Sequence, residues 1–149
     1  MEFNGLLTAT VFLPLAGALA IATLVKGDRN IRVFAGLIAL AELALAIGVM
    51  VLFDHGEGAQ RFQLVDKFAW IGEGSIFDNG TMDAGYHLAV DGLSAPMVLL
   101  TGLLGFCAIV GSWNVQLRVK EYFVWLLVLQ TAVMGVFVSM DFLLFFLFW

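Results

Sequence analysis

The distribution of apolar residues along the chain predicts four membrane-spanning helices. A helix of about 20 residues crosses a hydrocarbon core about 30 Å thick, and four apolar runs have this length. They occupy residues 6–25, 33–53, 93–113 and 122–140. Three of these runs contain no charged residue, and the second contains only Glu42. We therefore expect an all-α polytopic membrane protein.

A fifth apolar run, 142–149, is too short to cross a bilayer. A half-helix that ends in hydrocarbon leaves backbone carbonyls unpaired, so we expect the natural chain to continue beyond Trp149 and complete this helix. Residues 1–149 would then be the N-terminal part of a single membrane domain. The length of the first run and the acidic Glu2 before it favour a retained helix over a cleaved signal peptide. Pro14 predicts a kink in this helix.

The segment 54–91 is the longest polar stretch and predicts a β-hairpin over the helix ends. Strand-forming residues occupy 62–65 and 68–71, and apolar and polar residues alternate at 86–90. Asp78-Asn79-Gly80 between them is a turn signal, because Asn-Gly accepts positive φ at low cost. We expect apolar side chains of this loop to rest against the membrane interface, namely Trp70, Ile71 and Phe77.

Composition supports the membrane class. Hydrophobic residues make up 62% of the chain and charged residues 13%, with a mean hydropathy of +0.99, whereas soluble domains carry about 25% charge. The net charge of −5 reflects one loop, because seven of the twelve acidic residues lie in 54–91. No cluster of Lys and Arg exceeds three residues, which argues against nucleic-acid binding.

The basic residues predict the orientation in the membrane. The loops after the first and third helices contain Lys26, Arg29, Arg32, Arg118 and Lys120. The positive-inside rule places both loops in the cytoplasm, so the N-terminus and the loop 54–91 would lie on the outer side of the membrane.

Glu42 is the candidate for intramembrane chemistry. A charge at a helix centre costs about 2.5–3.5 kcal/mol on insertion scales, so such a side chain faces protein or water. Ala35, Ala39 and Ala46 share its helix face and would let another helix approach closely. Two interpretations remain open: a carboxylate in a proton path, or a buried acid held by hydrogen bonds.

Other polar residues have structural interpretations. Small and hydroxyl residues on one face of the third helix favour close packing over a water path; they are Ser94, Thr101, Gly105, Ala108 and Ser112. Asp91 is placed to cap this helix, His87 either titrates or forms structural hydrogen bonds, and Asp141 is a charge at the membrane boundary. Spacings typical of iron–sulfur, haem, zinc or nucleotide sites are missing from the sequence, so we expect no metal or cofactor in this chain.

Two motifs carry a family resemblance. The stretch YHLAVDGLS at 86–94 and the stretch DFLLFFLFW at 141–149 resemble sequences of the proton-pumping membrane subunits of respiratory complex I, NADH-quinone oxidoreductase. Segments 12–17 and 62–71 also fit, and the combination is most similar to the subunit M branch, the counterpart of mitochondrial subunit 4. The first motif contains His87, Asp91, Gly92 and Ser94, and the second begins at Asp141.

The resemblance implies about fourteen helices, two inverted five-helix repeats, and proton transfer coupled to quinone reduction. It also implies partner membrane subunits, with FMN, iron–sulfur clusters and quinone bound by other subunits. The family's relay glutamate and lysines would lie beyond Trp149, so no catalytic residue is assigned here. Multisubunit Na+/H+ antiporters and membrane-bound hydrogenases share this ancestry. A structural fragment without transport activity of its own is the remaining alternative.

Overall fold

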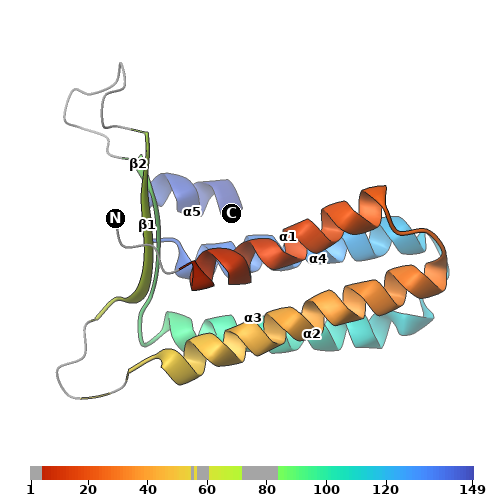
Figure 1. The fold of residues 1–149 in the computed structure, drawn as a ribbon, viewed down its shortest axis with the longest axis horizontal. Coiled ribbons are helices and arrows are strands. Elements are labelled where there is room, and N and C mark those ends of the chain that lie inside the picture. Colours follow the sequence, from red (N-terminus) through yellow and green to blue (C-terminus); the bar gives the residue numbers. More distant parts are fainter. Residues whose placement is uncertain (1–4, 55, 57–60, 72–83) are drawn as a thin grey trace.

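A computed structural model describes residues 5–54, 56, 61–71 and 84–149. Four long helices form an up-down-up-down bundle (Figure 1): α1 (Leu6–Thr23), α2 (Asp28–Leu52), α3 (Ser94–Gly111) and α4 (Val119–Val138). All four are long and apolar enough to cross a membrane. Each helix packs against the next, and α4 closes the bundle against α1. This arrangement confirms the predicted all-α membrane fold.

The helix boundaries differ from the apolar runs where polar residues continue a helix. α2 begins at Asp28, five residues before the predicted start, and its first turn carries this acid. A carboxylate there is favoured by the helix dipole. α3 is extended by a short 3-10 helix, Ser112–Asn114. α1 continues through the buried Pro14. Apolar length therefore locates the span, and polar end residues decide where the helix begins and ends.

The predicted hairpin is present as a two-stranded antiparallel sheet across one end of the bundle (Figure 1). Strand β1 (Gln63–Ile71) pairs with β2 (Ala84–Val90), with Lys67 opposite His87. The pairing shifts between Gln63 and Asp66, where Leu64 adopts φ 53°. This irregularity locally redirects the strand, as β-bulges do. The predicted turn at Asp78-Asn79-Gly80 lies outside the described residues, as do the predicted interface contacts of Trp70, Ile71 and Phe77.

A fifth helix, α5 (Phe142–Phe148), follows α4 after a short connection and contacts α4 and β2. It begins at the hairpin end and runs beside α4 (Figure 1). Asp141 caps it by accepting hydrogen bonds from the backbone N–H groups of Leu143 at 2.8 Å and Leu144 at 3.1 Å. The ring of Phe148 lies over Gly135 of α4, where a side chain would collide with it.

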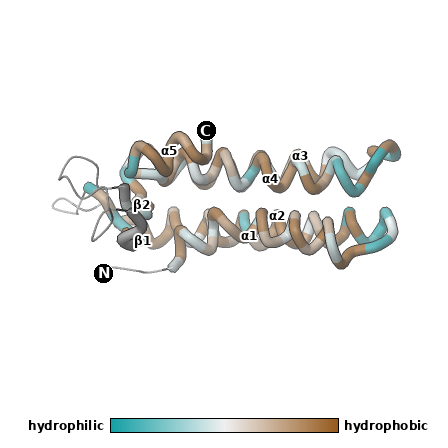
Figure 2. The backbone as a smooth tube through the Cα atoms, turned by 90° about the horizontal axis from the view of Figure 1, so that it is seen from above, coloured by the Kyte–Doolittle hydropathy of each residue, from teal (hydrophilic) through white to brown (hydrophobic). Residues whose placement is uncertain are grey.

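The two short loops meet at the opposite end of the bundle. Arg32 of α2 donates a hydrogen bond to the carbonyl of Val115 at 2.9 Å, which joins the base of α2 to the α3–α4 connection. Figure 2 shows hydrophobic residues along the helices and hydrophilic residues gathered toward the ends. Both predicted basic loops thus lie at one end, and the hairpin lies at the other.

Candidate functional site in a mid-bundle polar layer

The interior of the bundle divides into two apolar clusters. The hairpin-end cluster includes Val11, Ala46, Val98 and Met134, together with residues of β2 and α5. The second, which we call the loop-end cluster, lies toward the short loops. It contains buried residues of all four long helices: Ala18, Ile21, Ile31, Ala35, Ala39, Ile109, Val119, Phe123 and Leu127. The two clusters share no buried residue.

A polar layer separates these clusters. In α2, Glu42 lies between Ala39 of the loop-end cluster and Ala46 of the hairpin-end cluster. In α4, Gln130 and Thr131 occupy the corresponding place between the two clusters. In α3, the corresponding place is occupied by Thr101, Gly102 and Gly105. We call Glu42, Thr101, Gln130 and Thr131 the polar layer. Every helix that contributes to it does so at its middle.

Glu42 is fully buried, with 0% of its surface exposed. Neither carboxyl oxygen has a hydrogen-bond partner among the residues that the structure describes. An ionised carboxylate removed from water without a partner costs several kcal/mol, and even a neutral polar group left unpaired costs about 1–3 kcal/mol. The predicted alanine face around it is confirmed, because Ala35, Ala39 and Ala46 are also fully buried.

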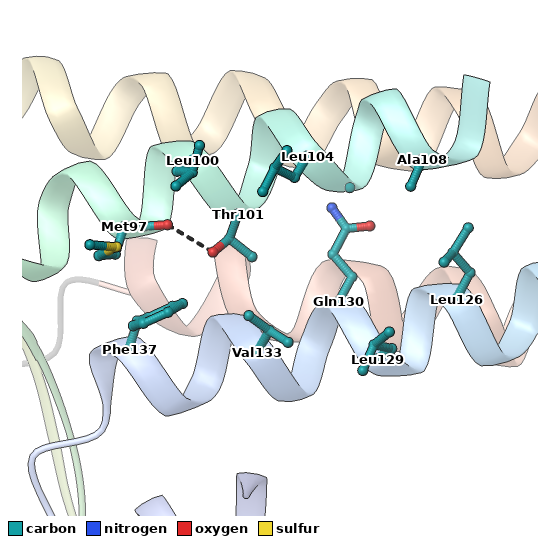
Figure 3. A pocket seen from close by; sticks show the side chains of 11 residues that line it. Met97, Leu100, Thr101, Leu104, Ala108, Leu126, Leu129, Gln130, Val133 and Phe137 are labelled. Carbon is teal, nitrogen blue, oxygen red and sulfur yellow. Dashed lines mark hydrogen bonds between the residues drawn. The ribbon is translucent and has the colours of Figure 1, made fainter. Parts of the chain in front are cut away.

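Gln130 is the second buried polar group of the layer. It is 5% exposed, and neither its amide nitrogen nor its amide oxygen has a partner in the described part of the chain. Its side chain points from α4 toward α3 (Figure 3). There it occupies the space beside Gly105, and any Cβ at residue 105 would overlap the amide. Glycine at this position therefore makes room for Gln130.

Glu42 and Gln130 approach the same part of α3. A Cβ built on Gly102 would lie 3.0 Å from the Cβ of Ala46 and 3.5 Å from the Cα of Leu43, so α2 and α3 are in close contact there. The two helices are antiparallel, and one helical turn further brings Glu42 opposite the turn that contains Gly105. Gln130 covers Gly105 from the side of α4. α2 and α4 also contact each other directly.

The two threonines of the layer bond within their own helices. Thr131 donates to the carbonyl of Leu127 at 3.2 Å, and Thr101 donates to the carbonyl of Met97 at 2.7 Å (Figure 3). Each hydroxyl oxygen can still accept a hydrogen bond. The layer therefore combines one acid, one amide and two hydroxyl acceptors.

A groove between α3 and α4 reaches this layer. It has a volume of about 360 Å³, and Gly105, Thr101, Ala108 and Gln130 are among its lining residues. Apolar side chains make up most of the remainder (Figure 3). Three residues of the predicted small-residue face of α3 line this groove, so that face is directed toward α4. From the same face, Ser112 is hydrogen-bonded to the hydroxyl of Tyr122 at 2.8 Å.

The hairpin supplies a second polar cluster at the end of the bundle. Asp66 of β1 is fully buried and accepts hydrogen bonds from the backbone N–H groups of Gly5 at 2.6 Å and Thr8 at 2.9 Å. It also accepts one from the Thr8 hydroxyl at 2.8 Å, and Tyr86 donates to that hydroxyl at 2.9 Å. A strand residue thereby caps α1, and burial raises the pKa of Tyr86.

The remaining sequence-predicted residues organise this end. Asp91 accepts hydrogen bonds from the backbone N–H groups of Leu93 and Ser94 and from the Ser94 hydroxyl, as expected for a cap, and these bonds lower its pKa. Gly92 lies in the connection that Asp91 closes. The backbone carbonyl of His87 accepts from the N–H of Met140. Asp141 also receives an N–H bond from Gly85 at 3.3 Å, which ties α5 to β2.

His87 itself has an altered titration. Burial lowers its pKa, the neighbouring charge of Lys67 lowers it further, and Asp141 opposes the shift. Among the described residues, no three His, Cys, Asp or Glu side chains come together as a metal site would require. The described acids and hydroxyls around the hairpin form hydrogen bonds to backbone groups and to one another.

Sequence reasoning identified Glu42 but missed Gln130 and Asp66. Gln130 carried a signal, because it is a lone amide in the middle of a charge-free apolar run. Asp66 carried none, since it is one of seven acids in a polar loop and its partners lie about 60 residues away.

The chain is similar in sequence to membrane subunits of quinone oxidoreductases. Chain 4 of the NAD(P)H-quinone oxidoreductase of Nostoc sp. is 36% identical over 144 residues, which cover 96% of this chain and 25% of that protein. Subunit M of the NADH-quinone oxidoreductase of Rhodobacter capsulatus is 35% identical over 150 residues, covering 97% of this chain and 27% of the relative. The chloroplast chain 4 of Mesostigma viride is 32% identical over 146 residues.

No protein-family model matches the chain. It spans about a quarter of the length of the curated relatives that it matches. The similarity nevertheless extends over nearly the whole of this chain, and includes all four long helices and the hairpin. Over these residues, the chain is similar in sequence to NAD(P)H-quinone oxidoreductase chain 4 and to NADH-quinone oxidoreductase subunit M.

Proposed function

We propose that this chain is part of a proton-translocating membrane subunit of NADH-quinone oxidoreductase, which couples quinone reduction to proton transfer across the bilayer. The observation that carries the proposal is the similarity to chain 4 and subunit M over about 96% of the chain. The bundle is compatible with this role, because its helices are apolar outside and enclose a polar layer at mid-depth.

The proposal assigns electron transfer to other subunits. FMN, iron–sulfur clusters and quinone would be bound there, and this chain would contact neighbouring membrane subunits of the complex and the lipid. Proton passage through a membrane subunit requires protonatable groups and water in its interior. Glu42 is the proton-path candidate within these residues, since it is the acid at the centre of the bundle.

We further propose the bacterial cytoplasmic membrane as the location, with the hairpin on the outer side. The location follows from the similarity to subunit M of a bacterial NADH-quinone oxidoreductase, and the orientation is supported by the charge distribution. Arg29, Arg32, Arg118 and Lys120 lie at the loop end of the bundle, and cytoplasmic ends of membrane proteins are enriched in Lys and Arg. Cysteine accessibility to a membrane-impermeant maleimide tests this: a cysteine in place of Gly56 should react from outside, and one in place of Lys120 only after permeabilisation. The reverse labelling pattern would place the hairpin in the cytoplasm and contradict the proposed orientation.

Proton pumping in inverted membrane vesicles tests the function. The gene for the full-length protein is deleted and then restored, and acidification of the vesicle interior is followed with a fluorescent dye after addition of NADH and a soluble quinone. We expect pumping to depend on the restored gene and to stop with a quinone-site inhibitor. Proton movement that requires a sodium gradient and is indifferent to NADH would instead identify a cation/proton antiporter.

The same vesicles test the contribution of Glu42. Glu42→Gln keeps the size of the side chain and removes the exchangeable acid. We expect a modest decrease in pumping per NADH oxidised, because the amide of glutamine keeps the hydrogen-bonding capacity of the side chain while the exchangeable acid is lost. A loss as complete as that from deletion of the gene would place Glu42 in the central relay and contradict the expectation.

A further inference from the structure

We infer that Glu42 and Gln130 form one hydrated proton-holding site, in which the carboxyl is protonated and water links it to the amide beside Gly105. The ligand of the site is water together with one proton. Its use as a step of translocation rests on the proposed function, whereas its hydration and proton content do not.

The burial of both side chains is the first support. Glu42 is 0% and Gln130 is 5% exposed, and the polar atoms of both lack partners among the described residues. Two such groups on different helices at one depth are unusual, because buried polar side chains are nearly always hydrogen-bonded. Both face the same turn of α3, so one cluster of water molecules can satisfy both.

The second support is chemical complementarity. A protonated carboxyl has one donor and free acceptor positions, and a primary amide has two donors and an acceptor. Water molecules between them can therefore use two to four hydrogen bonds each, which is what a buried water requires. The Thr131 hydroxyl oxygen adds an acceptor in the same layer, since its own proton is committed to Leu127.

The surroundings favour a neutral acid. The facing helices α1 and α3 contain no charged residue. The charged residues of α4 are Lys120 and Glu121, which lie in its first turn. On α2 itself, the charged residues stand at the loop end, at least ten residues from Glu42: Asp28, Arg29 and Arg32. No described cation is therefore placed to compensate an ionised Glu42, and the proton remains on the carboxyl.

The groove between α3 and α4 provides the route for proton exchange at the site. Gln130 and Gly105 line the groove between α3 and α4, whereas Glu42 is fully buried and is not among the lining residues. Of the two side chains, Gln130 is therefore the one that the groove reaches, and it points from α4 toward α3 (Figure 3). Replacement of the amide by an apolar side chain should remove one hydrogen bond from the water and slow proton exchange at Glu42.

Infrared difference spectroscopy tests the site on the full-length protein in its purified, lipid-reconstituted complex. The spectrum of wild type minus Glu42→Gln should contain one carbonyl band of a protonated carboxylic acid, shifted to lower frequency in D2O. In Gln130→Leu the same band should move to higher frequency and exchange at least threefold more slowly. Thr101→Val is the matched control, because it removes a polar group from the same groove while Gln130 is retained.

Each outcome decides the inference. Carboxylate bands in place of the acid band, or an acid band that does not exchange in D2O, overturns it. Equal effects of Thr101→Val and Gln130→Leu also overturn it. If Glu42→Gln fails to assemble, the spectrum of wild type minus Gln130→Leu takes its place, because it should contain one exchangeable acid band displaced to higher frequency in the variant. A complex that pumps without an exchangeable acid band refutes the site alone, and an exchangeable band without NADH-linked pumping refutes only the function.

Discussion

The capping of α1 by a residue of the hairpin makes a quantitative prediction. Asp66→Ala removes the acceptor for the backbone N–H groups of Gly5 and Thr8 and for the Thr8 hydroxyl, at 2.6, 2.9 and 2.8 Å. A helix cap is worth about 0.5–2 kcal/mol, and a buried donor left unpaired costs about 1–3 kcal/mol. The two costs partly describe the same lost hydrogen bonds, so they are not simply added. We expect the first turn of α1 to lose about 2–4 kcal/mol of stability against local opening.

Hydrogen–deuterium exchange read by mass spectrometry measures this opening. Since about 1.4 kcal/mol corresponds to a tenfold change in an equilibrium constant, the amides of residues 5–9 should exchange at least ~25-fold faster in Asp66→Ala. Tyr86→Phe removes only the hydrogen bond to Thr8, so its effect should be smaller, about 0.5–1.5 kcal/mol.

The control is Glu121→Ala, which removes an acid from an exposed ion pair with Arg118. Exposed pairs contribute little, so exchange at residues 5–9 should be unchanged. An acceleration below about threefold in Asp66→Ala would correspond to less than about 0.7 kcal/mol. That result would refute the reasoning, because it would mean that the hairpin does not stabilise the start of α1.

Two further predictions concern packing and pH. Gly102→Ala should destabilise the bundle by about 1–3 kcal/mol in thermal unfolding in detergent, because the new Cβ meets Ala46 at 3.0 Å. The control is Gly111→Ala, which should be neutral or stabilising because no atom lies within 4 Å of the added Cβ. Equal losses of stability in the two variants would contradict this packing. The pKa of His87 is lowered on folding, so below pH about 6.5 the unfolded chain takes up the proton first and stability falls on acidification. The difference in unfolding temperature between wild type and His87→Gln should therefore change between pH 7 and pH 5, and a constant difference would contradict the shift.

The element order could be predicted from sequence because the bilayer leaves few choices. An apolar run of membrane length must pair its backbone groups within itself, so it forms a helix, and runs 6–25 and 122–140 were recognisable on this basis. The hairpin was recognisable from alternation at 86–90. Helix ends were predicted less well: α2 starts at Asp28 rather than at residue 33, because polar residues continue a helix beyond the hydrocarbon.

Packing between the helices and the hairpin selects the side chains that form the polar layer and the cap of α1. The four helices are apolar around most of their circumference, so hydrophobicity does not specify which face meets which neighbour, and register is set by close contacts such as those at Gly102 and Gly105. Those contacts bring Gln130 to the turn of α3 that Glu42 also faces. The pairing of Asp66 with Thr8 likewise depends on how the hairpin crosses the bundle. The spans and their order therefore follow from the sequence, because each apolar run must pair its own backbone groups in lipid, whereas packing between the helices selects the residues of the candidate site.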